Sequence, residues 1–260
     1  MEIEQRPSPK DKPVSLFVTC MIDMLYPQTG MSVVRVLEYL GVAVDFPMSQ
    51  TCCGQPGFNA GYRDDARAVA RQFLHAFQDA EVIVTPSGSC AAMVRHEYPA
   101  LFAQDPQRQR LALRLASITW EFTEYVVTGL GISDLQARLP QAQRFAIHDA
   151  CHGLRLLGLG HEARALLAHV ENATLVQLPD ADVCCGFGGL FSVKMADVSG
   201  AMLRNKLEAI EQCPADCILT GDASCQTHMN GGLQRRGSPK RVRHLADVLA
   251  EALSLQNEET

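Results

Sequence analysis

Short apolar runs alternate with segments of helical periodicity, and this alternation occurs twice along the chain. The runs are rich in valine, isoleucine, leucine and phenylalanine, a composition typical of buried strands. They occupy residues 13–20, 42–47, 81–86, 144–151, 173–178 and 216–221. Segments with apolar residues at helical spacing lie between them, at residues 31–39, 60–77, 162–169 and 190–210. Strands that alternate with helices in this way predict right-handed βαβ units and a parallel sheet in each half.

The repeated order of the elements indicates an internal duplication. We expect an α/β fold of two duplicated, Rossmann-like βαβ halves with parallel sheets, related by a pseudo-twofold axis. The expected boundary divides the chain into an N-terminal domain, residues 1–140, and a C-terminal domain, residues 141–260.

Three further stretches complete the expected secondary structure. Residues 111–130 predict a helix, and residues 132–140 predict another, with Ser133 as its cap and Pro140 as its stop. Residues 243–256 have an amphipathic pattern, which predicts a C-terminal helix.

Eight of the ten cysteines follow the duplication. In each half a first cysteine is followed, 32 or 33 positions later, by a Cys-Cys-Gly triplet, and a last cysteine comes 37 or 40 positions after the triplet's second cysteine. The two sets are Cys20, Cys52, Cys53 and Cys90, and Cys151, Cys184, Cys185 and Cys225. All of them fall at or after the carboxyl ends of predicted strands, where open parallel sheets bind ligands. We therefore expect three loops in each half to bring four thiols to one site.

Charge and composition narrow the class of protein. The formal net charge of −6 argues against nucleic-acid binding, which usually requires a basic face. The charged, proline-rich segment at residues 1–13 has no apolar region of a signal peptide, and no apolar run reaches the length of a membrane span. We therefore expect a cytoplasmic protein without a transmembrane segment. Because disulfides are rare in a reducing cytosol, the clustered thiols predict metal ligands or redox groups.

The glycine after each cysteine pair explains how two adjacent thiols reach one target. Neighbouring side chains on an extended strand point in opposite directions, so the backbone must turn sharply after the pair. Gly54 and Gly186 can adopt a positive φ at little steric cost, and Gly188 and Gly189 allow closer backbone approach in the second half.

Three kinds of site are compatible with these thiols. Four soft ligands from three loops, beside glycine-rich backbone that can donate N–H groups to sulfur, favour iron–sulfur clusters, most simply one or two [4Fe–4S] clusters. A thiol–disulfide reductase acting through the adjacent pairs is a second interpretation. A zinc-stapled scaffold is a third, although structural zinc usually takes paired C-x₂₋₄-C knuckles.

The full pattern resembles the CCG cysteine-rich domain family, which includes the cysteine-rich subunit of heterodisulfide reductase. The stretches "PSGSCAAM" and "HDACHGLR" make the chain similar to family members that take part in lactate utilization, and the resemblance covers nearly the whole chain. It implies an iron–sulfur electron-transfer subunit that works with other subunits of a cytoplasmic complex oxidising L-lactate, a small organic acid, to pyruvate. The "GFGG" after Cys185 is not a nucleotide-binding fingerprint, so we expect the isolated chain not to oxidise lactate.

One departure from the heterodisulfide reductase pattern concerns the end of each motif. That motif ends in C-x-x-C, whereas Ser87 and Asp222 stand where the first of those cysteines would be. Oxygen ligation by these two residues is one interpretation, and capping of the following helix is the one we favour.

The remaining candidates lie in the second half. His148, His152 and His228 flank its cysteines and are candidates for contacts to a cluster or substrate, whereas no histidine lies within five residues of the first set. We therefore expect the two sites to differ, with the C-terminal one the better cluster site. Cys213 and Cys217 have no counterpart in the first half and are expected to pack, Cys213 at a helix end and Cys217 at a strand start.

Overall fold

The computed structural model describes residues 6–254 of the chain. Residues 1–5 and 255–260, which include the start of the N-terminal segment and the end of the predicted C-terminal helix, lie outside the described part. None of the helices between residues 6 and 254 is both long and apolar enough to cross a bilayer.

The N-terminal half, from β1 to η2, is built on an all-parallel sheet with the strand order β2-β1-β3-β4. The segments η1 and η2 are π-helical turns. The elements of this half are β1 (Val14–Leu16), α1 (Cys20–Leu25), α2 (Pro27–Tyr39), β2 (Val44–Asp45), α3 (Gln55–Asn59), α4 (Arg63–Ala76), β3 (Val82–Thr85), α5 (Gly88–Ala92), η1 (Met93–Glu97), α6 (Tyr98–Leu101), α7 (Pro106–Ile118), β4 (Thr119–Glu121), α8 (Phe122–Glu124) and η2 (Tyr125–Gly129).

The C-terminal half, from β5 to α14, repeats this architecture with the strand order β6-β5-β7-β8, again all parallel. Its elements are β5 (Arg138–Ile147), α9 (Cys151–Leu157), α10 (Glu162–Ala168), β6 (Glu171–Leu175), α11 (Phe191–Lys194), α12 (Ala196–Gln212), β7 (Cys217–Thr220), α13 (Ala223–Arg235), β8 (Val242–His244) and α14 (Leu245–Ser254). The duplicated α/β fold with parallel sheets is therefore confirmed, and the predicted boundary between residues 140 and 141 stays a prediction.

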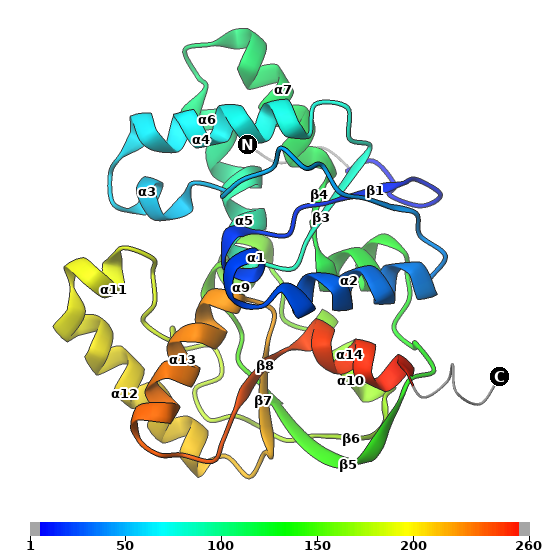
Figure 1. Ribbon diagram of the computed structural model, residues 1–260, viewed down its shortest axis with the longest axis vertical. Coiled ribbons are helices and arrows are strands. Elements are labelled where there is room, and N and C mark those ends of the chain that lie inside the picture. The colour runs from blue at the N-terminus through cyan, green and yellow to red at the C-terminus, as the bar shows by residue number, and fades with distance from the viewer. Residues whose placement is uncertain (1–5, 255–260) are drawn as a thin grey trace.

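The two halves meet along α5 and α9, which lie between the two sheets (Figure 1). Ser87 and Asp222, at equivalent positions, form an isolated antiparallel bridge, an arrangement that agrees with a twofold relation between the halves. Beside this bridge the backbones approach closely, because a Cβ atom on Gly88 would lie 2.9 Å from the Cα atom of Gly153.

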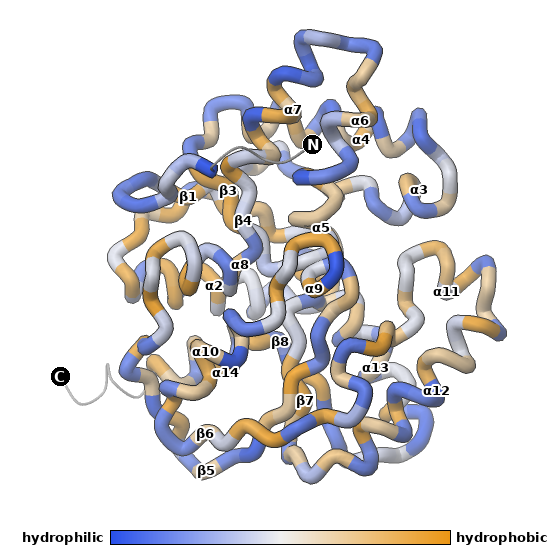
Figure 2. Tube along the Cα trace, turned by 180° about the vertical axis from the view of Figure 1, so that it is seen from behind, coloured by the Kyte–Doolittle hydropathy of each residue, from blue (hydrophilic) through white to orange (hydrophobic). Residues whose placement is uncertain are grey.

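The hydrophobic core is shared between the halves. One cluster of buried side chains contains Leu16 and Val84 from the first sheet and Phe145 and Leu219 from the second. Helices α2 and α14 pack side by side over this cluster (Figure 1), and each half has a smaller core of its own on the other side of its sheet. Apolar residues accordingly run along β3 and β7, whereas the outer turns are mostly hydrophilic (Figure 2).

Most of the predicted elements are present, in part with different bounds. The predicted helix at 31–39 is extended to Pro27, and the one at 190–210 is interrupted at Met195, which separates α11 from α12. The predicted strand at 42–47 is reduced to two residues.

Two predictions of secondary structure are wrong, and a third element is present with a later start. The helix predicted over 111–130 ends at Ile118, because residues 119–121 pair with β3 as the fourth strand of the first sheet. The helix predicted over 132–140 is absent, and Pro140 lies in β5, at an irregularity in its pairing with β6 where a missing N–H is tolerated. The helix predicted from residue 243 begins at Leu245, because residues 242–244 form β8.

Candidate metal centres

Each set of four cysteines is delivered by three loops at the carboxyl edge of one sheet. The first cysteine is the first residue of α1 or α9, just after the inner strand β1 or β5. The adjacent pair follows the outer strand β2 or β6, and the last cysteine lies in the first turn of α5 or α13, after β3 or β7. The structure thus places each predicted set at one edge, as the spacing led us to expect.

The N-terminal site contains a half-exposed pair and a buried pair. Cys20 and Cys52 are half-buried, with their Sγ atoms 3.4 Å apart, whereas Cys53 and Cys90 are buried. The backbone N–H of Gly54 donates to Cys52 Sγ at 3.3 Å. A surface cavity of about 290 Å³ opens beside the half-exposed pair.

The C-terminal site repeats this arrangement. Cys151 and Cys184 are half-buried and their Sγ atoms are 3.8 Å apart, whereas Cys185 and Cys225 are buried, with their Sγ atoms 3.3 Å apart. The N–H of Gly186 donates to Cys184 Sγ at 3.4 Å.

The thiols of each site shift one another's pKa values. The pKa of Cys52 is lowered to about 3, chiefly by hydrogen bonds from the thiols of Cys20 and Cys53, and the pKa of Cys184 is lowered to about 2, chiefly by Cys151 and Cys185. The same hydrogen bonds raise the pKa of each donor thiol. In each site the rim cysteine of the adjacent pair is therefore the more acidic thiol, and a thiolate is the form that binds soft metals.

Both triplet glycines adopt the left-handed conformation that the sequence predicts. The φ angles are 80° at Gly54 and 91° at Gly186. The second position is tighter, because a Cβ atom on Gly186 would lie 2.8 Å from the Ser199 carbonyl oxygen and 2.9 Å from Met202 Cβ. Gly188 and Gly189 also have positive φ angles, of 55° and 65°.

Ser87 and Asp222 cap helices. Ser87 Oγ accepts from Cys90 N at 3.2 Å, and Asp222 Oδ1 accepts from Ser224 N at 3.1 Å. Asp222 Oδ2 additionally accepts from Ser87 Oγ and from Ser89 N across the junction of the halves, both at 3.1 Å. The two residues thus fasten the halves together beside both sites.

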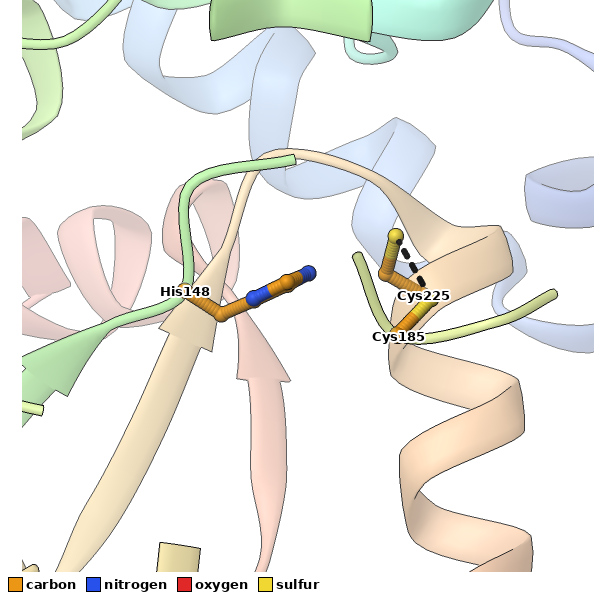
Figure 3. Close-up of side chains that lie close together, drawn as sticks. All are labelled: His148, Cys185 and Cys225. Atoms are coloured by element: carbon orange, nitrogen blue, oxygen red, sulfur yellow. Dashed lines mark hydrogen bonds between the residues drawn. The ribbon is translucent and has the colours of Figure 1, made fainter. Parts of the chain in front are cut away.

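The three candidate histidines lie at different depths in the C-terminal site. His148 is buried and its ring faces Cys185 and Cys225 (Figure 3). His152 Nδ1 is 3.6 Å from Cys151 Sγ on the rim. His228 contacts Ser199 Oγ at 3.4 Å and the ring of Phe187. All three surround the second set of cysteines, and their roles stay predictions.

The two remaining cysteines lie outside both sites. Cys213 is the C-cap of α12, with its thiol 3.4 Å from the Gln177 carbonyl oxygen, and Cys217 begins β7 as a buried residue. The expectation that both pack is consistent with these positions.

Sequence reasoning did not identify several supporting residues. Gln50 joins the first triplet loop to β1, because it accepts from Val18 N and donates to the Leu16 carbonyl. Tyr98 donates its hydroxyl to the Cys53 carbonyl at 2.9 Å. Glu121 and His244, at the ends of β4 and β8, are also buried near the junction. None of these residues belongs to a recognisable motif, so only the fold identifies them.

The donor sets fit an iron–sulfur cluster in chemistry. Each site offers four soft sulfur ligands and an amide N–H directed at sulfur, which are the features that hold and tune such clusters. In the C-terminal site His148 adds a nitrogen donor.

The family model and the similar proteins found by comparison all point to the same family. The CCG cysteine-rich domain matches twice, at residues 14–95 and 145–230. Lactate utilization protein A of Geobacillus thermodenitrificans is 48% identical over 91% of this chain and 98% of its own length. Lactate utilization protein A 2 of Bacillus cereus is 42% identical over 93% of this chain and 99% of its own length.

Among solved structures, a hypothetical protein from Helicobacter pylori shares the fold. It has a TM-score of 0.60 at 12% identity, and the match covers 96% of this chain and 51% of that one. At this identity the likeness concerns the fold alone.

Proposed function

The chain belongs to the CCG cysteine-rich domain family, and on that premise we propose that it is the iron–sulfur, electron-transferring component of a lactate-utilization system that oxidises L-lactate to pyruvate. The observation that carries the proposal is the gathering of two separate sets of four thiols, each at the carboxyl edge of its own sheet. A cluster bound by such a set supplies one-electron transfer. All eight cysteines of the two sets are proposed ligands.

The chain's own residues prepare each site for a metal centre. The buried cysteines would anchor the centre on the side of the core, and the half-exposed pair would hold it at the rim. The amide N–H groups of Gly54 and Gly186 stabilise negative charge on rim sulfurs. Because the rim thiols Cys52 and Cys184 already have low pKa values, little free energy is needed to deprotonate them for binding.

The surface around the half-exposed cysteines of the N-terminal site is suited to the docking of other subunits. Met24 and Met48 line the cavity beside Cys20 and Cys52, and their exposed fractions are 76% and 85%. Exposed apolar side chains beside a redox centre suit a surface that another protein covers during electron transfer. We propose that the other subunits of a lactate-oxidising complex dock near this rim, and that they act in the cytoplasm, where free thiols such as these ten persist.

The proposal is tested by analysing iron, acid-labile sulfide and zinc in anaerobically purified protein. We expect a brown protein with broad absorption near 400 nm and about four irons and four sulfides per occupied site. The chain should also restore growth on L-lactate to a host that lacks its own lactate utilization protein A, and the isolated chain should not oxidise lactate. Protein without iron or sulfide would overturn the proposal.

A second candidate function is that of a zinc-stapled scaffold, which the distances between the sulfur atoms favour. Four thiolates around a single zinc ion lie about 3.8 Å from one another, given Zn–S bonds of about 2.3 Å in a tetrahedron. The contacting sulfurs are 3.3–3.8 Å apart, close to that value. About one zinc per site without sulfide would establish this alternative. Metal-free protein whose adjacent thiols oxidise reversibly would instead indicate a thiol–disulfide reductase.

A further inference from the structure

The side chain of His148 is held in one tautomer by its surroundings. It follows β5 and is 1% exposed. Its Nδ1 atom lies 3.1 Å from the Ala181 carbonyl oxygen, which can only accept, so Nδ1 carries the hydrogen. Nε2 therefore presents a lone pair, as a metal-binding imidazole does when its other nitrogen donates to a carbonyl.

This Nε2 atom is buried and has no hydrogen-bond partner among residues 6–254. Buried polar atoms are seldom left unpaired, so a partner outside the chain is expected. The ring points toward the two buried sulfurs of the C-terminal site (Figure 3). A nitrogen of His148 and the sulfurs of Cys185 and Cys225 all lie within 4.8 Å of one another, close enough to share a metal.

The N-terminal half has no such donor at the equivalent position. Phe17 N donates to the Val84 carbonyl as His148 N donates to the Leu219 carbonyl, which makes Phe17 the counterpart of His148. The Phe17 ring instead packs against Phe73, with the ring centroids 5.0 Å apart. One half thus uses the position for packing, and the other directs an unpaired nitrogen at its cysteines.

We propose that His148 Nε2 is a direct ligand of the metal centre in the C-terminal half, in addition to its four cysteines, so that the two halves hold centres of different donor composition. The inference rests on the proposed function, because it assumes that a cluster occupies this site. Imidazole is neutral, so this ligand adds a nitrogen donor without adding negative charge, whereas a thiolate at the same position would make the centre more negative and lower its reduction potential.

The test uses pulsed EPR on the full chain, with the C-terminal centre in its paramagnetic state. The double substitution Cys53→Ser and Cys90→Ser removes the N-terminal centre, so that one signal is measured. We expect the nitrogen hyperfine coupling of a bound imidazole, changed by ¹⁵N-histidine labelling and lost in His148→Phe. His228→Phe, which removes a neighbouring histidine, should retain the coupling.

The variant His148→Cys is the control for the possibility that His148→Phe loses the nitrogen coupling only because it loses iron. A thiolate at this position should keep the iron content, abolish the nitrogen coupling and lower the midpoint potential of the centre. A cluster that shows no nitrogen coupling in the parent protein, or coupling that persists in His148→Phe or His148→Cys, would overturn the inference and leave the proposed function intact. Absence of iron and sulfide from every preparation would overturn both.

Discussion

The two halves of the molecule share their strand order, their four cysteines and the glycine turn after each pair, but they differ in what surrounds the sulfurs. Beside the first cysteine of the N-terminal half, Thr19 has a φ of 75°, a strained value for a β-branched residue, whereas its counterpart Ala150 has a relaxed φ of −60°. Behind the sulfurs, the N-terminal half has Phe17 where the C-terminal half has His148.

A second difference lies at the ends of the fourth strands. Glu121 pairs with Thr85 in the first sheet as His244 pairs with Thr220 in the second, so these two residues are counterparts. Glu121 Oε2 accepts from Thr123 N, and His244 Nδ1 accepts from Ala246 N, two residues on in each case. An acid and a base thus perform the same capping role. The two halves thus share their backbone turns and their cysteines, while the buried groups around these features differ.

Removing one buried cysteine from each half should show the largest difference between the two sites. Each half offers four thiolates, so equal sites would each account for about half of the bound iron. We expect Cys185→Ser to remove more than half and Cys53→Ser less than half, because the C-terminal site has His148 and additional glycines, whereas Pro56 removes an N–H donor beside the N-terminal site. Iron per protein and EPR intensity measure the outcome.

Cys213→Ser is the matched control, since it removes a buried thiol outside both sites and serine can still donate to the Gln177 carbonyl. It should retain the full iron content. Equal losses from Cys53→Ser and Cys185→Ser would show that the different surroundings do not affect occupancy.

The triplet glycines Gly54 and Gly186 should differ in how much stability the protein loses when each is replaced by alanine. Alanine at either position is strained by about 1–2 kcal/mol, because both φ angles are positive. At Gly54 a Cβ atom would have its nearest neighbours at 3.4 Å, whereas at Gly186 it would clash with the Ser199 carbonyl oxygen at 2.8 Å. We therefore expect Gly54→Ala to lower the free energy of unfolding by about 1–2 kcal/mol and Gly186→Ala by about 3 kcal/mol or more. Denaturant unfolding of both variants measures the difference, and similar losses would contradict it.

The counterparts Glu121 and His244 should give opposite pH dependences of stability. Burial raises the pKa of Glu121 from 4.5 to about 7, so the folded state binds more protons than the unfolded state between these values. The free energy of unfolding therefore falls as the pH rises through this range, by about 3 kcal/mol in total. Burial lowers the pKa of His244 below 6.5, so its contribution is lost as the pH falls below that value.

Glu121→Gln and His244→Gln separate the two effects. Relative to the parent, Glu121→Gln should gain stability as the pH rises from 5 to about 8, and His244→Gln should gain stability as the pH falls from 7 to about 5. Anaerobic denaturant unfolding at several pH values measures both slopes. Parallel slopes in the two variants and the parent would show that neither group titrates differently on folding.

The duplication, the parallel α/β fold and the gathering of the two cysteine sets were all predictable from the amino-acid sequence. These features depend on local periodicity and on the rule that parallel strands end at one edge, so the spacing of Cys20, Cys52 and Cys90 was sufficient to predict them. The turn at Gly186 was likewise predictable, because two adjacent thiols cannot face one target without it.

Contacts between groups that are far apart in the sequence were not predictable and became visible only in the folded chain. Strands β4 and β8 have three residues each and lie beside helical patterns, so only pairing with β3 and β7 makes them strands. The bond between Ser87 and Asp222 joins residues 135 positions apart, and His148 faces Cys185 and Cys225 rather than its sequence neighbour Cys151. Local propensity carries no information about such contacts, because they arise from the packing of two sheets whose mutual position no short stretch of sequence encodes.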